Sequence, residues 1–406
     1  MTNATSRKDA ASSNVSALCP GREEAWPYYA EDEIEAAAAV LRSGQVNQWT
    51  GPHVFAFQDA CTERFGGGHG IALANGSLAL ELALRTFDIG PGDEVVVTPR
   101  SFVASAFTVM LSGATPVFAD VDPDSGNITA ATIERVLTDR TRAIVPVHLA
   151  GWPADMPAIM ELARGRGIKV IEDCAQAHGA AIDGQSVGSF GDAAAFSFCQ
   201  DKIISTGGEG GFLSLRDEDS WKWAWSFKDH GKNWDKVNMP AVHSGMFRWL
   251  HDNVGTNWRL TGPQAAIGLR QLDKLQDWTR LRTRNASIWA TALGEVSGLR
   301  VPAPPPGVEH AYYKYYFYLD RPKAQASTFR GEILARATEA GLRLFSGSCS
   351  EMYLEEAFRD LPRPDCPVAR QMTDTSLMVE VHPTLRPDLL ERRAEQLASI
   401  CAQVLS

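Results

Sequence analysis

The chain has 406 residues, of which 44% are hydrophobic and 22% are charged, and its formal net charge is −10. This length suits about two to three domains, or one large domain with a smaller partner. The acidic balance argues against a nucleic-acid-binding protein, and no apolar run reaches the roughly 18 residues that a membrane helix needs.

The N-terminal stretch, residues 1–20, is rich in Ser, Ala and Asn and lacks the apolar segment of a secretory signal. We expect it to be a flexible tail. The seven cysteines are scattered without CxxC spacing, which predicts neither a zinc site nor a disulfide framework. We therefore expect no metal and a cytoplasmic location.

Residues 31–44 and 51–66 carry apolar positions at helical spacing and predict two amphipathic helices. Strands and helices then alternate. The predicted strands are near-continuous apolar runs at 93–99, 115–122, 142–151, 168–176 and 192–198, and helices are predicted between them at 101–114, 130–138 and 154–167. Such runs are typical of a parallel sheet that is covered on both faces, so we expect an open α/β sheet.

After the sheet, residues 264–292 predict one long helix, and the Pro-rich stretch 301–313 predicts a linker. A strand at 313–320 and helices near 328–340 and 387–405 follow, which is typical of a smaller α+β domain. We place a large α/β domain at 21–270 and a small C-terminal domain at 271–406.

Open α/β sheets bind ligands at the carboxyl ends of their strands, and two predicted features lie there. Gly76 and Ser77 begin a helix whose free N–H groups can hold a phosphate, with an ordinary helix cap as the alternative. Asp173 closes the strand at 168–176 and can hold a protonated ring nitrogen; the alternative is that Glu172 and Asp173 cap the next turn.

Two further features complete the set. Lys202 follows the strand at 192–198, and because adjacent strand ends lie about 5 Å apart, Asp173, Ser197 and Lys202 can line one pocket. A lysine amine there can form a Schiff base with an aldehyde. Phe102 can cover the face of an aromatic ligand, with a core position as the alternative. Together the four features predict pyridoxal 5′-phosphate (PLP) as the cofactor.

In the segments that carry these residues, the sequence resembles the DegT/DnrJ/EryC1/StrS family of PLP-dependent sugar aminotransferases. The segments that carry the resemblance span residues 25–275 and include "ANGSLALELAL", "GDEVVVTPRSFVASA", "VIEDCAQAHGA", "FSFCQDKIISTGGEGG" and "GTNWRLTGPQAAIGLRQL". The resemblance implies the fold-type I (aspartate aminotransferase-like) architecture, with a large, mostly parallel sheet domain and a smaller α+β domain. It also implies a homodimer with active sites at the subunit interface.

The resemblance implies roles for particular residues. Lys202 is the implied Schiff-base lysine, Asp173 the partner of the pyridinium nitrogen, and Gln176 the contact to the ring hydroxyl. The implied phosphate and ring contacts are Gly76, Ser77, Ser197, Phe102 and, from the second subunit, Asn257. Some relatives carry His at the lysine position and are sugar 3-dehydratases, a chemistry that Lys202 argues against.

The implied reaction moves an amino group from L-glutamate or L-glutamine to the keto group of a nucleotide-linked deoxysugar. A keto-cyclitol acceptor of the scyllo-inosose type is one alternative, and a non-catalytic PLP-binding homologue is another. Family members often carry a His-containing segment where this chain has residues 344–358, so the acceptor stays open. Trp49, Arg100 and His178 are candidate substrate contacts, with packing or solvation as the alternative for each.

Overall fold

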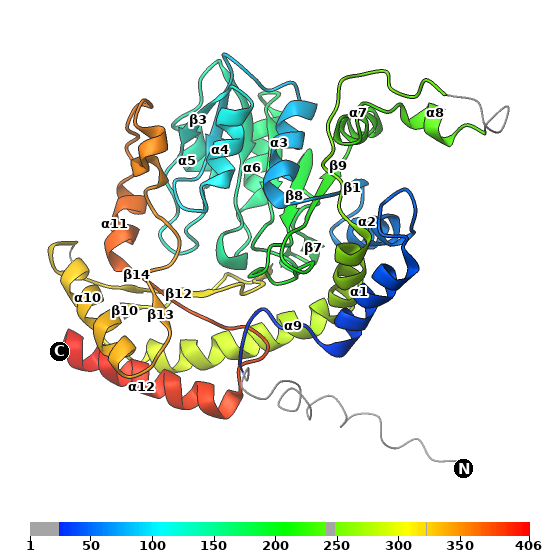
Figure 1. Cartoon of the computed structure of the whole chain (residues 1–406). Coiled ribbons are helices and arrows are strands. Elements are labelled where there is room, and N and C mark those ends of the chain that lie inside the picture. The colour runs from blue at the N-terminus through cyan, green and yellow to red at the C-terminus, as the bar shows by residue number, and fades with distance from the viewer. Residues whose placement is uncertain (1–23, 241–247, 322) are drawn as a thin grey trace, which may run out of the picture.

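A seven-stranded sheet forms the centre of the large domain (Figure 1) in the computed structural model, which describes residues 24–240, 248–321 and 323–406. Its strand order is β1–β9–β8–β5–β4–β2–β3. Neighbours from β8 to β3 run parallel, and β9 runs antiparallel to both β1 and β8. The strands are β1 (His69–Leu73), β2 (Glu94–Val97), β3 (Thr115–Phe118), β4 (Thr141–Val145), β5 (Lys169–Asp173), β8 (Ala193–Ser197) and β9 (Gly211–Leu215).

The sheet is buried on both faces because alternate residues of a strand enter different apolar clusters. In β8, Ala193 and Ala195 pack with one cluster, whereas Ala194 and Phe196 pack with another. The helices on the first face are α3 (Gly76–Thr86), α4 (Ala104–Leu111), α5 (Ala130–Glu134), α6 (Met156–Arg164) and α7 (Glu218–Lys228). The second face is covered by α2 (His53–Arg64) and by part of α9 (Gly262–Gly294).

The small domain is built on a four-stranded antiparallel sheet of order β10–β12–β14–β13. The strands are β10 (Leu299–Arg300), β12 (Tyr315–Leu319), β13 (Leu344–Phe345) and β14 (Ser376–Val379). Its main helices are α10 (Lys323–Glu339) and α12 (Pro387–Leu405). The expected fold class, a large mostly parallel domain with a smaller α+β domain, is confirmed.

The predicted boundary at residue 270 falls inside α9, which runs without a break from α1 (Glu31–Ser43) to the small domain (Figure 1). Residues 271–406 also do not form a separate unit. Met352, Phe358 and Met372 enter the core cluster of the large sheet, carried by η2 (Met352–Leu354), η3 (Glu356–Phe358) and α11 (Pro367–Thr375). This segment therefore packs on the large domain, although the chain has already passed through the small one.

The remaining elements lie at the edges. A short sheet joins β6 (Ala181–Ile182) to β7 (Gln185–Ser186) and to β11 (Val308–Glu309), which lies in the predicted linker. Helix α8 (Trp234–Asn238) follows α7, and a 3-10 turn, η1 (Leu149–Gly151), follows β4. The predicted helix at 130–138 is shorter in the structure, and the predicted tail, residues 1–20, lies outside the described residues. Within the described ranges, no helix is long and apolar enough to cross a membrane.

Candidate active site

Asp173 is the last residue of β5, and two hydrogen bonds fix its buried carboxylate. The Ser105 hydroxyl donates to Oδ2 at 2.8 Å, and the backbone N–H of Ala175 donates to Oδ1 at 3.1 Å. Ser105 belongs to the first turn of α4, where its own N–H donates to the carbonyl of Phe102. The carboxylate thus has one orientation at the carboxyl edge of the sheet.

The N-terminus of α3 meets the end of β8 at Gly76. Asn75 caps this helix by accepting the N–H of Leu78 at 3.0 Å. A Cβ placed on Gly76 would lie 2.6 Å from the Cβ of Ser197, so a larger residue would force the two elements apart. Gly76, Ser77 and Ser197 therefore come together, with free helix N–H groups and hydroxyls that suit a phosphate.

Lys202 lies in the turn after β8, and its side chain is only 15% exposed. Its Nζ lies 4.0 Å from Oδ1 of Asp201 and 5.1 Å from the centre of the Tyr313 ring. The Tyr313 hydroxyl donates to Asp201, and the indole N–H of Trp26 donates to the Lys202 carbonyl at 3.0 Å. The amine is therefore sheltered beside an aromatic ring, which excludes the alternative of a freely solvated lysine.

Phe102 and Gln176 differ in exposure. The Phe102 side chain is 69% exposed although it follows a buried strand, which excludes the core alternative and leaves an aromatic face free for stacking. Gln176 is buried, and its Oε1 accepts the N–H of Ala150 at 2.7 Å, which orients the amide.

Trp49 and Asn257 lie beside a cluster of charges around the buried carboxylate of Asp229. The Trp49 indole donates to Asp229 Oδ2 at 3.0 Å, and Arg259 donates to Oδ1 at 2.7 Å. Asn257 forms a backbone bridge with Asp229, and its own side chain is exposed. Burial, opposed by the Asp229 charge, lowers the pKa of the neighbouring Lys228 to about 7. Both predicted residues are thus accessible from outside the chain.

Arg100 is enclosed, so no substrate can touch it in this structure, contrary to the expectation of a substrate contact. Its side chain has no exposed surface and donates to the hydroxyl of Ser350. The guanidinium lies 5.1 Å from the ring centre of Tyr316 and 5.9 Å from that of Tyr318. Arg100 thereby joins the end of β2 to the C-terminal part of the chain.

His178 is also withdrawn from any substrate, because its side chain is 0% exposed within the apolar cluster on the α2 and α9 face. The rings of Phe65, Phe196 and Phe198 surround it at 5.4–5.9 Å between centres. Among the described residues, neither ring nitrogen has a hydrogen-bond partner. Burial and then nearby positive charges lower the pKa of His178 to about 3, so the ring is neutral. The packing alternative holds for this residue.

Three residues that orient the candidate site were not predicted from the sequence: Ser105, Ala150 and Tyr313. Ser105 stands three residues after Phe102, in the first turn of a predicted helix. That position could have indicated that its hydroxyl lies near the predicted cofactor site. Ala150 acts through its backbone N–H alone, and Tyr313 is more than 100 residues from Lys202 in the sequence. Nothing in the local pattern around these two residues indicates their role.

A lysine in the turn after β8 and an aspartate at the end of β5, both at one edge of a mostly parallel sheet, match the arrangement expected of a fold-type I aminotransferase. The chain belongs to the DegT/DnrJ/EryC1/StrS aminotransferase family, whose model matches residues 27–398.

Relatives agree with this assignment. An aminotransferase structure from Psychrobacter cryohalolentis is 46% identical, with a TM-score of 0.90 and coverage of 95% of this chain and 100% of that one. The UDP-N-acetyl-3-dehydro-α-D-glucosamine 3-aminotransferase of Acidithiobacillus ferrooxidans is 38% identical over 80% of this chain and 82% of its own length. A putative L-glutamine:3-amino-2,3-dideoxy-scyllo-inosose aminotransferase of Streptoalloteichus tenebrarius is 34% identical, covering 78% of this chain and 74% of its own length.

Proposed function

We propose that this aminotransferase uses PLP, held by Lys202 as a Schiff base, to move an amino group from L-glutamate or L-glutamine to the keto group of a nucleotide-linked deoxysugar. The observation that carries the proposal is the meeting of Gly76 with Ser197 at the same sheet edge as Asp173 and Lys202. Each of these residues offers what one part of PLP requires.

The chemical groups of these residues match the phosphate, the ring nitrogen and the ring face of PLP. The glycine contact at the start of α3 keeps space and N–H groups for a phosphate. The fixed, buried carboxylate of Asp173 suits a protonated ring nitrogen, and the exposed ring of Phe102 suits a stacked heterocycle. When bound, PLP supplies the electron sink that stabilises negative charge on the substrate carbon.

The chain's residues then have distinct tasks. The negative charge of Asp173 keeps the ring nitrogen protonated, which sustains the electron sink. With PLP bound, the Lys202 amine would serve as the general base and acid that removes a proton from the substrate carbon and later returns it. Its sheltered position next to Tyr313 limits exchange of that proton with bulk water.

The acceptor proposal is supported by the relative named for a UDP-linked keto sugar, and the cyclitol alternative by the relative named for a scyllo-inosose derivative. An assay that offers both acceptor classes with the same donor separates them. A yellow protein whose spectrum does not change with any amino donor would instead favour the non-catalytic alternative.

The central test is Lys202→Ala in the purified protein. We expect loss of transamination and of the visible absorbance of covalently held cofactor. Lys169→Ala is the matched control, because Lys169 stands at the opposite end of β5, paired at 2.9 Å with Asp192. Retention of activity and absorbance in K202A would refute the assignment.

We also propose a homodimer in which Asn257 of one subunit contacts the cofactor phosphate in the other. Its exposed side chain supports this arrangement. A cytoplasmic location stays a prediction from the cysteine pattern; all six cysteines in the described residues are free.

A further inference from the structure

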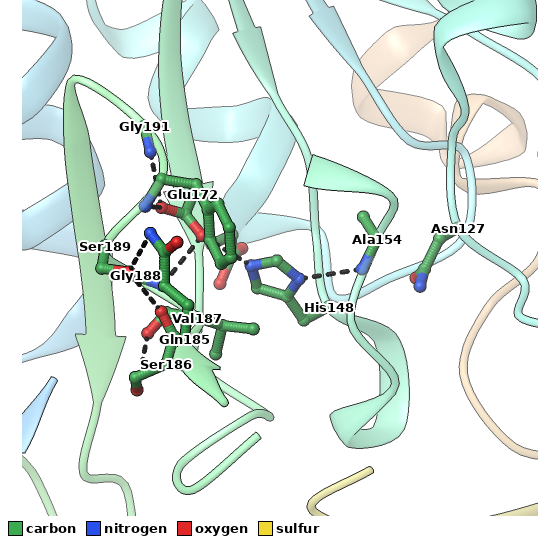
Figure 2. Close-up of polar contacts among 12 residues, drawn as sticks. Asn127, His148, Ala154, Glu172, Gln185, Ser186, Val187, Gly188, Ser189 and Gly191 are labelled. Atoms are coloured by element: carbon green, nitrogen blue, oxygen red, sulfur yellow. Dashed lines mark hydrogen bonds and ion pairs between the residues drawn. The ribbon is translucent and has the colours of Figure 1, made fainter. Parts of the chain in front are cut away.

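Behind Asp173, Glu172 and His148 form a buried polar pair (Figure 2). Both side chains are 0% exposed, and His148 Nε2 lies 3.2 Å from Glu172 Oε2. Glu172 directly precedes Asp173 on β5, so the two carboxylates point to opposite faces of the sheet. A buried charge is costly unless it is fully paired, which makes the environment of Glu172 informative.

The Glu172 carboxylate accepts hydrogen bonds from a loop that follows β7 (Figure 2). The N–H groups of Phe190 and Gly191 donate to Oε1 at 2.8 and 2.7 Å, and that of Gly188 donates to Oε2 at 2.8 Å. Burial by itself raises the pKa of Glu172, but the hydrogen bonds from His148 and from the N–H groups of Gly191 and Gly188 outweigh it, so the pKa is lowered. Glu172 is therefore an anion, and it holds the loop rather than capping the next turn.

The tautomer of His148 follows from its second contact. The N–H of Ala154 donates to Nδ1 at 3.0 Å, so that nitrogen carries no proton. Nε2 then carries the ring proton and donates to Glu172. The imidazole is fixed at both nitrogens, by Glu172 on β5 and by Ala154 in the segment before α6.

The same turn touches the cofactor side of the sheet. The His148 N–H donates to the Asp173 carbonyl at 3.2 Å, and the Asp173 N–H donates to the Pro146 carbonyl at 2.9 Å. Two residues after His148, the N–H of Ala150 donates to Gln176 Oε1. The turn that holds His148 is thus hydrogen-bonded directly to both Asp173 and Gln176.

Cys174 belongs to the same buried group, in which one potential ligand atom of each of three residues lies within 4.8 Å of the others. The oxygens of Glu172 and both nitrogens of His148 already have partners. This favours a structural task over a metal site.

We propose that Glu172 and His148 are positioning residues of the amino-transfer site. The pair fixes the turn at 148–150 and the end of β5, and so sets where Asp173 and Gln176 meet the cofactor. The negative charge of Glu172 also adds to the field that favours the protonated cofactor. The inference rests on the proposed function.

Three variants test the pair by absorbance titration with PLP. In Glu172→Gln, the new amide places an N–H against another donor, so we expect PLP to bind about tenfold more weakly. Loss of the negative charge should also move the pH midpoint of the bound-cofactor absorbance to lower pH. A residue that only maintains the fold would not move that midpoint.

The two His148 variants separate the two contacts. His148→Gln keeps a donor near the Nε2 position, and His148→Asn keeps an acceptor near Nδ1. If the link to Glu172 matters, H148Q should bind PLP within about threefold of wild type, whereas H148N should match the loss in E172Q. The comparison of H148Q with H148N tests the link between His148 and Glu172 even if E172Q does not fold.

Asn285→Ala is the matched control. Asn285 is also fully buried, and its amide donates to the carbonyls of Val381 and His382 in the small domain at 3.2 and 2.9 Å. It should lower stability without changing PLP affinity. Unchanged affinity and midpoint in E172Q, or weaker binding by H148Q than by H148N, would overturn the inference. Failure of the wild-type protein to bind PLP would instead overturn the proposed function.

Discussion

Ser105 acts on Asp173 from the first turn of α4, through a 2.8 Å hydrogen bond between two buried side chains. Ser105→Ala should weaken PLP binding about tenfold, because a hydrogen bond to a charged group contributes roughly 1.5–3 kcal/mol. Titration of the apoprotein with PLP measures this. Ser112→Ala is the control, because the Ser112 hydroxyl donates to the Val109 carbonyl at the other end of the helix. The affinity of S112A for PLP should equal that of the wild type. Equal affinities for the two variants would contradict the role of Ser105.

His178 predicts a pH dependence of stability. Its pKa is about 3 in the folded chain, against an ordinary value of 6.5, because burial disfavours the charged ring. Below pH 6.5 the unfolded chain binds a proton that the folded chain does not. The contribution of this group is therefore complete above pH 6.5 and is lost as the pH falls toward 3.

His178→Phe should remove this dependence. Between pH 7.5 and 5 the wild type should lose about 2 kcal/mol of unfolding free energy through this residue, and the variant should not. At pH 7.5 the variant should be at least as stable, since two buried nitrogens without partners are replaced by an apolar ring among phenylalanines. Denaturant unfolding at both pH values measures the free energy of unfolding of each protein. If the wild type and H178F lose the same amount of this free energy between pH 7.5 and 5, His178 is not the source of the pH dependence.

At the scale of elements, α11 depends on a cap from a distant part of the chain. Asp120, just after β3, accepts the N–H groups of Val368 and Ala369 at 3.0 and 2.9 Å. A carboxylate at a helix N-terminus satisfies free donors and complements the helix dipole. Asp120→Ala should therefore cost about 1–2 kcal/mol of unfolding free energy and increase amide exchange in α11.

Asp122→Ala is the comparison for this prediction, because among the described residues the Asp122 carboxylate accepts only from its own turn, at Ser125 and Asp124. It should leave exchange in α11 unchanged. If D120A and D122A affect α11 equally, the long-range cap is not what holds the helix.

Elements formed by local pattern were predictable, and contacts between distant elements were not. The helices at 31–44 and 387–405 and the apolar strands follow from spacing alone. Asp173 ends β5, and Lys202 follows its parallel neighbour β8. Arg100 shows the limit. Its position at a strand end suggests a ligand contact, but Tyr316, Tyr318 and Ser350, more than 200 residues later, enclose it. Likewise, local spacing does not show that residues 352–372 return to the core of the large sheet after the chain has formed part of the small domain.

At the scale of the whole molecule, the proposed dimer places Lys202 and Asn257 of each active site on different chains. Asn257 is exposed and borders the charge cluster around Asp229, whereas Lys202 is sheltered after β8. In a closed two-fold dimer, both sites would be built in the same way. This arrangement can be separated from a site complete within one chain by mixing two variants, each with one of these two residues replaced.

Co-expression of differently tagged Lys202→Ala and Asn257→Ala chains gives three dimers that can be purified by tag. If the site is shared, the mixed dimer contains one site with both mutations and one site with neither. A random mixture should then recover about one quarter of wild-type activity, and the doubly tagged dimer about one half. If Asn257 acts within its own chain, each site of the mixed dimer carries one mutation, and its activity should be about half that of the N257A dimer, because the K202A site contributes nothing. The doubly tagged fraction must also recover visible cofactor absorbance in one of its two subunits, because only the Asn257→Ala chain retains Lys202.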